Sequence, residues 1–392
     1  MAERYKRFQQ KLTERAQVNR LRKLQTWCSH HQSGMLENNF QDDTLLNMCS
    51  NDYLGLSVHP DVIQQGCQYL QKYGAGARSS RLISGNLLCH DELEEKLARF
   101  FNVESCLVFN TGFQGNISII HALADRSTVI FIDKWAHNSL IQGARLSNAT
   151  VFRYSHNDAD HLHSLLKRHT DRQHKLIITE SVFSMDGDRA PLNEISALAE
   201  TNEALLLVDD AHAVGVFGED GRGLAYSNNR IDFITGTFGK SFGALGGYVL
   251  CKRQMKEYFI NFSSGFIYST GIQPATAGSV LAALELIPVL ETERSQILEN
   301  ATYLRSSLQK MGFDTGVSDS QIVPVIIGSD EQALALSSYL FSKGFLVSAV
   351  RPPAVQEGKA RLRFTITTSV TKEHVESLVD AIKVFKSMKV EA

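Results

Sequence analysis

Residues 205–212 follow an apolar run with side chains whose chemistry packing alone does not explain. They read Leu-Leu-Leu-Val-Asp-Asp-Ala-His, so a carboxylate, Asp209, and an imidazole, His212, stand where an expected buried strand ends. Ligands of α/β proteins bind at this edge of a parallel sheet, although an acid in this position can also simply cap a loop. The segment therefore predicts a ligand-binding carboxylate or a loop cap.

A lysine flanked by glycines follows the next expected strand. The segment Thr237-Phe-Gly-Lys-Ser-Phe-Gly243 places Lys240 where a bulky ligand can approach it closely. A lysine that is desolvated near other cations loses its proton more readily, and its neutral amine can form an imine with an aldehyde. The alternative is an exposed loop lysine.

Two further segments suit anionic groups. Residues 110–116 follow the apolar run Leu107–Phe109 and open an expected helix, whose first N–H groups can hold a phosphate. In residues 360–365, an expected strand carries Arg361 and Arg363 on one face, a pattern that suits a bidentate carboxylate clamp. An ordinary Thr/Gly helix start and a solvated strand face stay open as the alternatives.

Together these four segments supply the parts that a pyridoxal-phosphate enzyme needs. The lysine binds the cofactor aldehyde, and the aspartate pairs with the pyridine nitrogen and keeps it charged. The histidine can donate to the ring oxygen, and the helix start can bind the phosphate. The combination, in sheet order, predicts this cofactor more strongly than any one segment does.

The sequence does not match the residue spacing of the common nucleotide-binding and zinc-binding motifs. Residues 236–241 end like a phosphate-binding P-loop, but Ile234 stands where the first glycine is needed. Residues 74–79 lack the third glycine of a dinucleotide fingerprint. The histidines at 156, 161 and 163 have no spacing that suits zinc, so we expect no metal site and interpret them as solvated surface residues.

Composition narrows the class of protein. The 392 residues carry 40 Lys+Arg and 42 Asp+Glu, so the net charge of −2 indicates no nucleic-acid or membrane-surface partner. No apolar run is long enough to span a membrane, and the first residues do not resemble a secretory signal. Six scattered cysteines without a C-x-x-C pair are typical of reduced thiols, which predicts a cytoplasmic protein.

Apolar runs alternate with amphipathic segments from residue 45 onward, a pattern that predicts an α/β fold with a mostly parallel sheet covered by helices. Residues 1–25 predict one basic amphipathic helix, and the last hundred residues predict a strand–helix–strand–helix unit. We therefore expect an N-terminal helical arm (1–49), a large cofactor-binding domain (50–285) and a small C-terminal domain (286–392).

At these residues the chain resembles the α-oxoamine synthases, a family of fold-type I pyridoxal-phosphate enzymes, over nearly its whole length. The matching segments are 50–56, 81–85, 179–187, 208–212, 237–240 and 268–270. Segments 348–353 and 360–363, and secondarily 184–188, are similar to the members that condense L-alanine with a pimeloyl thioester in biotin biosynthesis. The resemblance implies a homodimer with active sites between the subunits.

The resemblance also implies residue roles. Lys240 would bind the cofactor covalently and remove the Cα proton, Asp209 would pair with the pyridine nitrogen, and His212 with the ring hydroxyl. His137 would stack on the ring and hydrogen-bond the substrate keto oxygen. Further cofactor contacts would fall on Gly112, Phe113, Ser184, Thr237, Ser269 and Thr270, the last two reaching the cofactor phosphate of the partner subunit. Substrate contacts would fall on Arg22, Asn51, Ala354 and Arg363.

Two departures from the family pattern and several alternatives stay open. Arg78 and Ser79 stand where smaller residues are common, and Ala354 replaces a substrate-contacting threonine of many relatives. For Arg22, a solvated helix face is the alternative. The acyl carrier is coenzyme A or an acyl carrier protein. A glycine C-acetyltransferase, a serine palmitoyltransferase or a 5-aminolevulinate synthase would use the same residues, and an aminotransferase, a lyase or an inactive scaffold are further alternatives.

Overall fold

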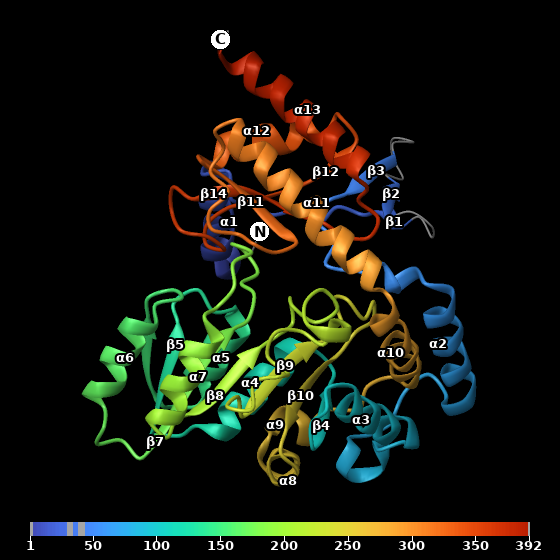
Figure 1. Cartoon of the computed structure of the whole chain (residues 1–392), viewed down its shortest axis with the longest axis vertical. Coiled ribbons are helices and arrows are strands. Elements are labelled where there is room, and N and C mark those ends of the chain that lie inside the picture. Colours follow the sequence, from blue (N-terminus) through green and yellow to red (C-terminus); the bar gives the residue numbers. More distant parts are fainter. Residues whose placement is uncertain (1–2, 30–33, 38–43, 391–392) are drawn as a thin grey trace. The chain divides into compact units, whose positions relative to one another are not determined.

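The computed structural model describes residues 3–29, 34–37 and 44–390, which divide into two units (Figure 1). Unit 1 contains the described residues of Met1–Ser50, Met185–Gly187 and Ile297–Ala392. Unit 2 contains Asn51–Ser184 and Asp188–Gln296. The chain therefore leaves unit 2 for three residues in the middle of one loop.

Unit 2 is built on a seven-stranded sheet in the order β4-β10-β9-β8-β7-β5-β6. β10 runs antiparallel to both of its neighbours, and the remaining pairs are parallel. The predicted mostly parallel sheet is thus confirmed. Its strands are β4 (Ser105–Phe109), β5 (Thr128–Asp133), β6 (Thr150–Tyr154), β7 (His174–Glu180), β8 (Leu205–Asp209), β9 (Phe233–Thr237) and β10 (Gly247–Cys251).

Helices cover both faces of this sheet, which is why its central strands are nearly continuous apolar runs. Ile120 and Leu140 from the helices on one face pack with Ile130, Ile178 and Leu207 of the strands in one buried cluster. Helices α4 (Gly112–Leu123), α5 (Asn138–Leu146), α8 (Arg253–Phe262) and α9 (Ser264–Ile267) contribute to this cluster. Helices α6 (Ala159–Arg168) and α7 (Leu192–Thr201) pack together with β6 and β8.

Three longer helices complete unit 2. α10 (Pro274–Leu286) packs against α2 (Pro60–Tyr73) and α3 (Leu88–Phe100). Both α10 and α2 begin with a proline at their first position, where the missing N–H costs no helical hydrogen bond. Short 3₁₀ turns lie at Leu56–Val58, Glu219–Gly221 and Ile287–Val289, and a five-residue π-helix spans Arg81–Gly85.

Unit 1 contains the predicted strand–helix–strand–helix tail. Its main sheet is antiparallel in the order β11-β14-β13, and a second small sheet has the order β1-β2-β3-β12. The strands are β1 (Cys28–Ser29), β2 (Met35–Glu37), β3 (Thr44–Asn47), β11 (Ile322–Gly328), β12 (Phe345–Leu346), β13 (Ser348–Val350) and β14 (Ala360–Thr365). The helices are α1 (Lys6–Gln17), α11 (Glu291–Lys310, which begins in unit 2), α12 (Asp330–Phe341) and α13 (Lys372–Val390).

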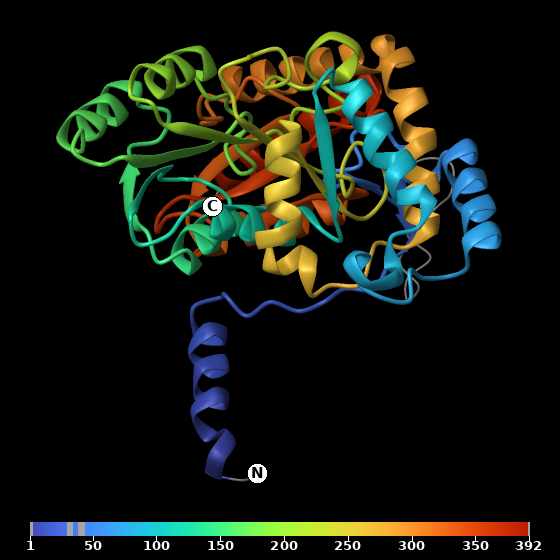
Figure 2. The ribbon, with the colours of Figure 1, turned by 90° about the horizontal axis from the view of Figure 1, so that it is seen from below.

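The expectation of one helix over residues 1–25 is wrong. α1 ends at Gln17, because Asn19 adopts a left-handed conformation (φ 57°) and the N–H of Arg20 bonds to the carbonyl of Arg15 at 2.8 Å. An extended segment follows, so Arg22 is not on a helix (Figure 2). α1 buries none of its residues, so no packing extends it past this stop signal.

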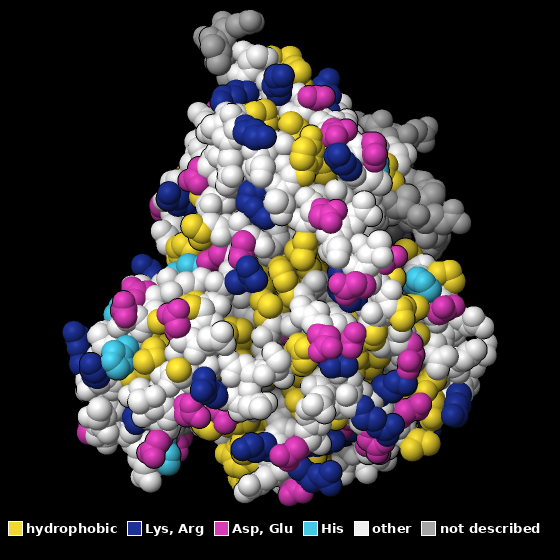
Figure 3. All heavy atoms as spheres, in the orientation of Figure 1, with side chains coloured by type: hydrophobic (Ala, Val, Ile, Leu, Met, Phe, Trp, Pro, Cys, Tyr) yellow, Lys and Arg dark blue, Asp and Glu magenta, His cyan; other side chains and the backbone are white. Residues whose placement is uncertain are grey.

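Charged side chains of both signs are interspersed on the face shown in Figure 3. Among the described residues no single helix has the length and apolarity to cross a bilayer, and one bent helix pair, Pro274–Val289 with Glu291–Lys310, meets the criteria of length and composition only.

Gly236 in β9 provides a test of the sheet's packing. A Cβ at this position would lie 2.3 Å from Cζ and Oη of Tyr248, whose side chain is fully buried. We expect Gly236→Ala to lower the free energy of unfolding by about 1–3 kcal/mol, measured by urea denaturation.

Gly76→Ala is the matched control, because no heavy atom lies within 4 Å of its added Cβ. Its effect should stay within about 0.5 kcal/mol. Equal losses in the two variants would contradict the packing argument.

Candidate active site

The candidate site lies at one edge of the sheet of unit 2. Because β4, β5, β7, β8 and β9 are parallel to one another, their carboxyl ends meet at this edge. Glu180 and Asp209 are direct neighbours across β7 and β8, and Asp209 is opposite Thr235 of β9. Acidic side chains from neighbouring strand ends are thereby brought together.

Asp209 is 8% exposed, and hydrogen bonds fix its carboxylate. Oδ2 accepts from Nδ2 of Asn116 in α4 at 2.7 Å, and Oδ1 accepts from the backbone N–H of Ala211 at 3.0 Å. The same Asn116 amide donates to Oγ of Ser139 at 2.9 Å. Asp209 therefore does cap its loop, but a buried amide also orients it from a different helix.

His137 is the N-cap residue of α5. Its ring Nδ1 accepts from the N–H of Ser139, and its own backbone N–H donates to Oε1 of Glu180 at 2.6 Å. The ring of Phe113 meets it edge-on at a centroid distance of 6.2 Å. Burial lowers the pKa of His137, with Asp209 opposing and Lys240 adding to this effect, so the neutral imidazole is favoured.

Lys240 lies half-buried in the turn after β9, and its charge acts on both His137 and Glu180. The turn closes with the N–H of Gly243 donating to the carbonyl of Lys240 at 2.8 Å. Gly243 has φ 63°, and a Cβ there would lie 2.2 Å from the backbone N of Ser57. The backbone therefore requires glycine at position 243, three residues after the lysine.

His212 is held by Tyr53, whose hydroxyl lies 2.6 Å from ring Nδ1. Both side chains are buried. Tyr53 comes from the loop before α2, two residues after Asn51, so this contact also brings the segment of Asn51 to the strand-end edge. Ser184 lies on the loop after β7, which starts from the same edge.

The start of α4 forms a narrow cradle beside β9. The hydroxyl of Thr111 caps the helix by accepting from the N–H of Gln114 at 3.0 Å. A Cβ at Gly112 would lie 3.1 Å from Cβ of Thr237, a tight contact, so the glycine leaves more room for a ligand against the first N–H groups of α4. The hydroxyl of Thr237 donates to the carbonyl of Gly246 at 2.8 Å, so donation to a phosphate would require replacing that bond.

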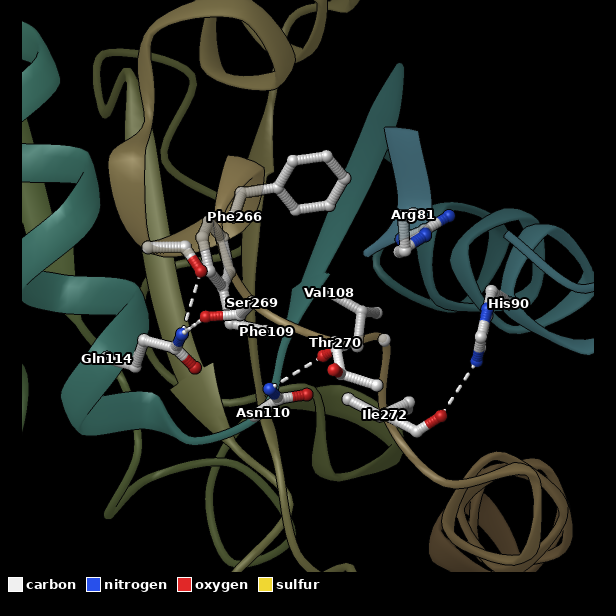
Figure 4. Close-up of a pocket in the computed structure, with 12 residues that line it drawn as sticks. Arg81, His90, Val108, Phe109, Asn110, Gln114, Phe266, Ser269, Thr270 and Ile272 are labelled. Atoms are coloured by element: carbon white, nitrogen blue, oxygen red, sulfur yellow. Dashed lines mark hydrogen bonds between the residues drawn. The ribbon is translucent and has the colours of Figure 1, made fainter. Parts of the chain in front are cut away.

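Ser269 and Thr270 lie beside the start of α4 and line a small cavity of about 20 Å³ (Figure 4). Nε2 of Gln114 donates to the carbonyl of Gly265 at 2.7 Å and to Oγ of Ser269 at 2.6 Å. Because both amide hydrogens are used, Ser269 accepts here and its hydroxyl hydrogen points elsewhere. Nδ2 of Asn110 donates to the carbonyl of Thr270 at 2.9 Å.

The remaining predicted residues belong to unit 1. Arg363 is 8% exposed in β14 and donates to Oγ1 of Thr365 at 2.8 Å. Arg361 is 5% exposed and pairs with Asp186. The alternative of a solvated strand face is therefore wrong for both arginines. Arg22 is exposed in the segment after α1, and Ala354 is exposed in a turn closed by its N–H to the carbonyl of Arg351.

The residues in unit 2 fit pyridoxal phosphate. A buried, hydrogen-bonded carboxylate at Asp209 suits a protonated pyridine nitrogen, and the cradle at Gly112 suits a phosphate. Lys240, which can carry the covalent bond, acts electrostatically on His137, the residue expected to face the ring. The chemistry of this donor set matches the cofactor without any additional group.

Several supporting residues were not predicted from the sequence. They are Asn116 on Asp209, Glu180 on His137, Tyr53 on His212 and Gln114 on Ser269. Tyr53 and Glu180 lie within the matching segments, and Gln114 and Asn116 lie in the helix-start segment 110–116, but the partners of all four are distant in sequence.

Comparison with known proteins places the chain in a family. The model of class I and II aminotransferases matches residues 43–382. A protein of Desulfosudis oleivorans is 48% identical over 339 residues, covering 86% of this chain and 88% of its own. The 8-amino-7-oxononanoate synthase of Geobacter sulfurreducens is 42% identical over 340 residues, covering 86% and 87%.

Solved structures agree with the fold. Serine palmitoyltransferase from S. paucimobilis, with pyridoxal phosphate and myriocin bound, superposes with a TM-score of 0.91 at 28% identity and covers 98% of each chain. The 8-amino-7-oxononanoate synthase of Francisella tularensis gives a TM-score of 0.77 at 27% identity, covering 88% of this chain and 98% of its own. The predicted fold-type I architecture is thereby confirmed, and so is the prediction that the cofactor is pyridoxal phosphate.

Asp210 makes the stability of the site region depend on pH. Its carboxylate is fully buried and accepts from the N–H groups of Leu224 and Ala225, and burial raises its pKa to about 7. The folded protein therefore keeps a proton that the unfolded chain releases near pH 4. Raising the pH from 4 to 8 should lower the free energy of unfolding by roughly 2–4 kcal/mol through this group.

Asp210→Asn cannot ionise, so its unfolding free energy should vary less with pH than that of the unchanged protein. Urea unfolding at several pH values measures the difference between the two. Parallel pH profiles would contradict a raised pKa at Asp210.

Proposed function

The chain belongs to the class I and II aminotransferase family, and on that premise we propose that it condenses L-alanine with a pimeloyl thioester. The products would be 8-amino-7-oxononanoate, CO2 and the free thiol carrier, a step of biotin biosynthesis. The observation that carries the proposal is the 41–42% identity to enzymes named 8-amino-7-oxononanoate synthase over 86% of the chain. The site residues supply the matching chemistry.

Bound pyridoxal phosphate supplies an electron sink for the negative charge that forms at Cα of the amino acid. Lys240 would bind the cofactor covalently and, as a free amine, would accept the Cα proton. Asp209, oriented by Asn116, would pair with the pyridine nitrogen and favour its protonated form. His212, held by Tyr53, would hydrogen-bond the ring hydroxyl.

The substrates need positioning more than activation, because the reaction joins two bound molecules. The guanidinium of Arg363 and the amide of Asn51 would hold the alanine carboxylate. His137 is favoured as a neutral imidazole, so it can donate a hydrogen bond to the keto oxygen before CO2 is lost. The backbone N–H groups of Gly112 and Phe113 would hold the cofactor phosphate.

A serine palmitoyltransferase activity is the second candidate. The structural match to such an enzyme of Sphingomonas wittichii, with a TM-score of 0.90 over 97% of each chain, favours it, although the sequence identity is only 29%. The two activities differ in the amino acid and in the length of the acyl chain. A single assay therefore separates them.

We expect thiol release with L-alanine and pimeloyl-coenzyme A or pimeloyl-acyl carrier protein, and little with glycine or L-serine. The measurement is free thiol together with CO2, with each amino acid offered to each carrier. Thiol release with serine and palmitoyl-coenzyme A but not with alanine would favour the second candidate.

Two variants control the assay. Lys240→Ala should lose borohydride-dependent fixation of the cofactor and at least about 100-fold in turnover, because it removes both the attachment and the base. Lys252→Ala, at an exposed lysine before α8, should keep both. Undiminished turnover in the Lys240 variant would contradict the assignment.

We further propose that the enzyme works as a homodimer in the cytoplasm. None of the six cysteines, all of them in the described part of the chain, forms a disulfide, which fits a reducing compartment. Ile83 is 80% exposed and Tyr268 is 84% exposed, and the bridge between Ser80 and Thr270 places their segments side by side. Exposed apolar side chains in neighbouring segments favour an interface here, next to the residues expected to reach the partner's cofactor.

Ile83→Asp should shift the protein from dimer to monomer in sedimentation velocity, because a carboxylate in an apolar interface is costly. Leu146→Asp is the control, since Leu146 is 54% exposed at the end of α5 and outside this surface. A monomeric unchanged protein would contradict the proposal.

A further inference from the structure

His156 was interpreted from the sequence as a solvated surface residue, and that interpretation is wrong. Its side chain is 11% exposed and lies between two carboxylates, with Nδ1 3.0 Å from Oδ1 of Asp133 and Nε2 2.7 Å from Oδ2 of Asp188. A neutral imidazole has one N–H and cannot donate to both. Two carboxylate partners therefore favour the doubly protonated, charged ring.

The surroundings of the ring support this charge. Trp135 stacks on it at a centroid distance of 3.9 Å and an interplanar angle of 24°, and Phe183 meets it edge-on at 4.3 Å. Burial lowers the pKa of His156, but hydrogen bonds to Asp133 and Asp188 outweigh burial and raise it to about 9. The carboxylates facing the ring come from the end of β5 and from the loop after β7.

Asp133 fixes the backbone that leads to His137. Oδ1 accepts from the N–H of Trp135 at 2.7 Å, Oδ2 accepts from the N–H of Asn157 at 2.9 Å, and its carbonyl accepts from the N–H of Ala136 at 3.2 Å. The whole side chain is buried. The turn between the end of β5 and the start of α5 is thus held by Asp133 through both its carboxylate and its carbonyl.

Asp188 fixes the loop that carries Ser184. Its carbonyl accepts from the N–H of Phe183 at 3.0 Å, and the next pair, Val182 and Arg189, forms an isolated β-bridge. Its Oδ2 also accepts from Nδ2 of Asn157 at 2.7 Å. His156 therefore joins the ends of two separate loops through one ring.

We propose that His156 is a positioning residue whose charged ring clamps the 133–137 and 182–188 loops and thereby sets His137 and Ser184 for the cofactor. The inference rests on the proposed function, because the two positioned residues are the ones expected to contact the ring. The clamp also acts electrostatically. The negative charge of Asp133 raises the pKa of Glu180, whose carboxyl accepts from the N–H of His137. The positive charge of His156 would offset that of Asp133.

The test compares His156→Gln with the unchanged protein in two states. In the apoprotein, proton–carbon correlation spectra of labelled histidines should show the His156 signal titrating near pH 9, and the His137 signal should move in the variant. In the holoenzyme the visible circular dichroism of the cofactor should change. The dissociation constant of pyridoxal phosphate and kcat should each worsen by about 10- to 100-fold, with KM for alanine changed less than about threefold.

Two further variants keep the test decisive. His174→Gln makes the same substitution at an exposed histidine where β7 begins and should change none of these quantities. Asp188→Asn removes only one arm of the clamp, so it should weaken cofactor binding while leaving the His137 signal in place. It also serves if His156→Gln does not fold.

The outcomes separate this inference from the proposed function. An unchanged protein that takes up no pyridoxal phosphate contradicts the function. The clamp is contradicted if the unchanged protein binds pyridoxal phosphate and His156→Gln has the same His137 signal, cofactor affinity, dichroism and kcat. A variant that loses thermal stability but none of these also contradicts it.

Discussion

The physical constraint on which the site depends is the burial of several carboxyl groups at one edge of a parallel sheet. Asp133, Glu180, Asp209 and Asp210 all lie at or beside strand ends and all are nearly inaccessible to solvent. A buried carboxylate is costly unless donors or a cation face it. Each therefore has a dedicated partner: His156 for Asp133, the N–H of His137 for Glu180, Asn116 for Asp209, and two loop amides for Asp210.

These partners explain how the edge can hold a charged, reactive ligand. Asp209 presents its carboxylate from a fixed direction, and burial favours a neutral ring at His137. Lys240 enters from a turn whose final glycine admits no side chain. A cofactor bound among these groups would meet oriented dipoles rather than mobile water, which is the condition for strong electrostatic stabilisation of a developing charge.

Sequence patterns predicted the strands that are apolar runs, such as β4 and β8, and the helix α4 that opens after β4. They did not predict β6, because its exposed and half-buried positions leave no continuous apolar run. They extended α1 too far, because the charged, amphipathic pattern continues past Asn19. The helix itself has already ended, since Asn19 adopts a left-handed backbone conformation. They also predicted a solvated His156 and left a solvated strand face open for Arg361 and Arg363, because the carboxylates that partner His156 and Arg361 come from other parts of the chain.

The sequence by itself determined the fold class and the cofactor, and it selected Lys240, Asp209 and His212 as the candidate cofactor residues, because these follow from local motifs placed after apolar runs. Tertiary structure alone decided which side chains support them. Asn116 reaches Asp209 across 93 positions and Tyr53 reaches His212 across 159, and no local pattern encodes such pairs. Burial and protonation depend on what packs around a group, so the raised pKa of His156 and the lowered pKa of His137 arise only when distant loops are brought together.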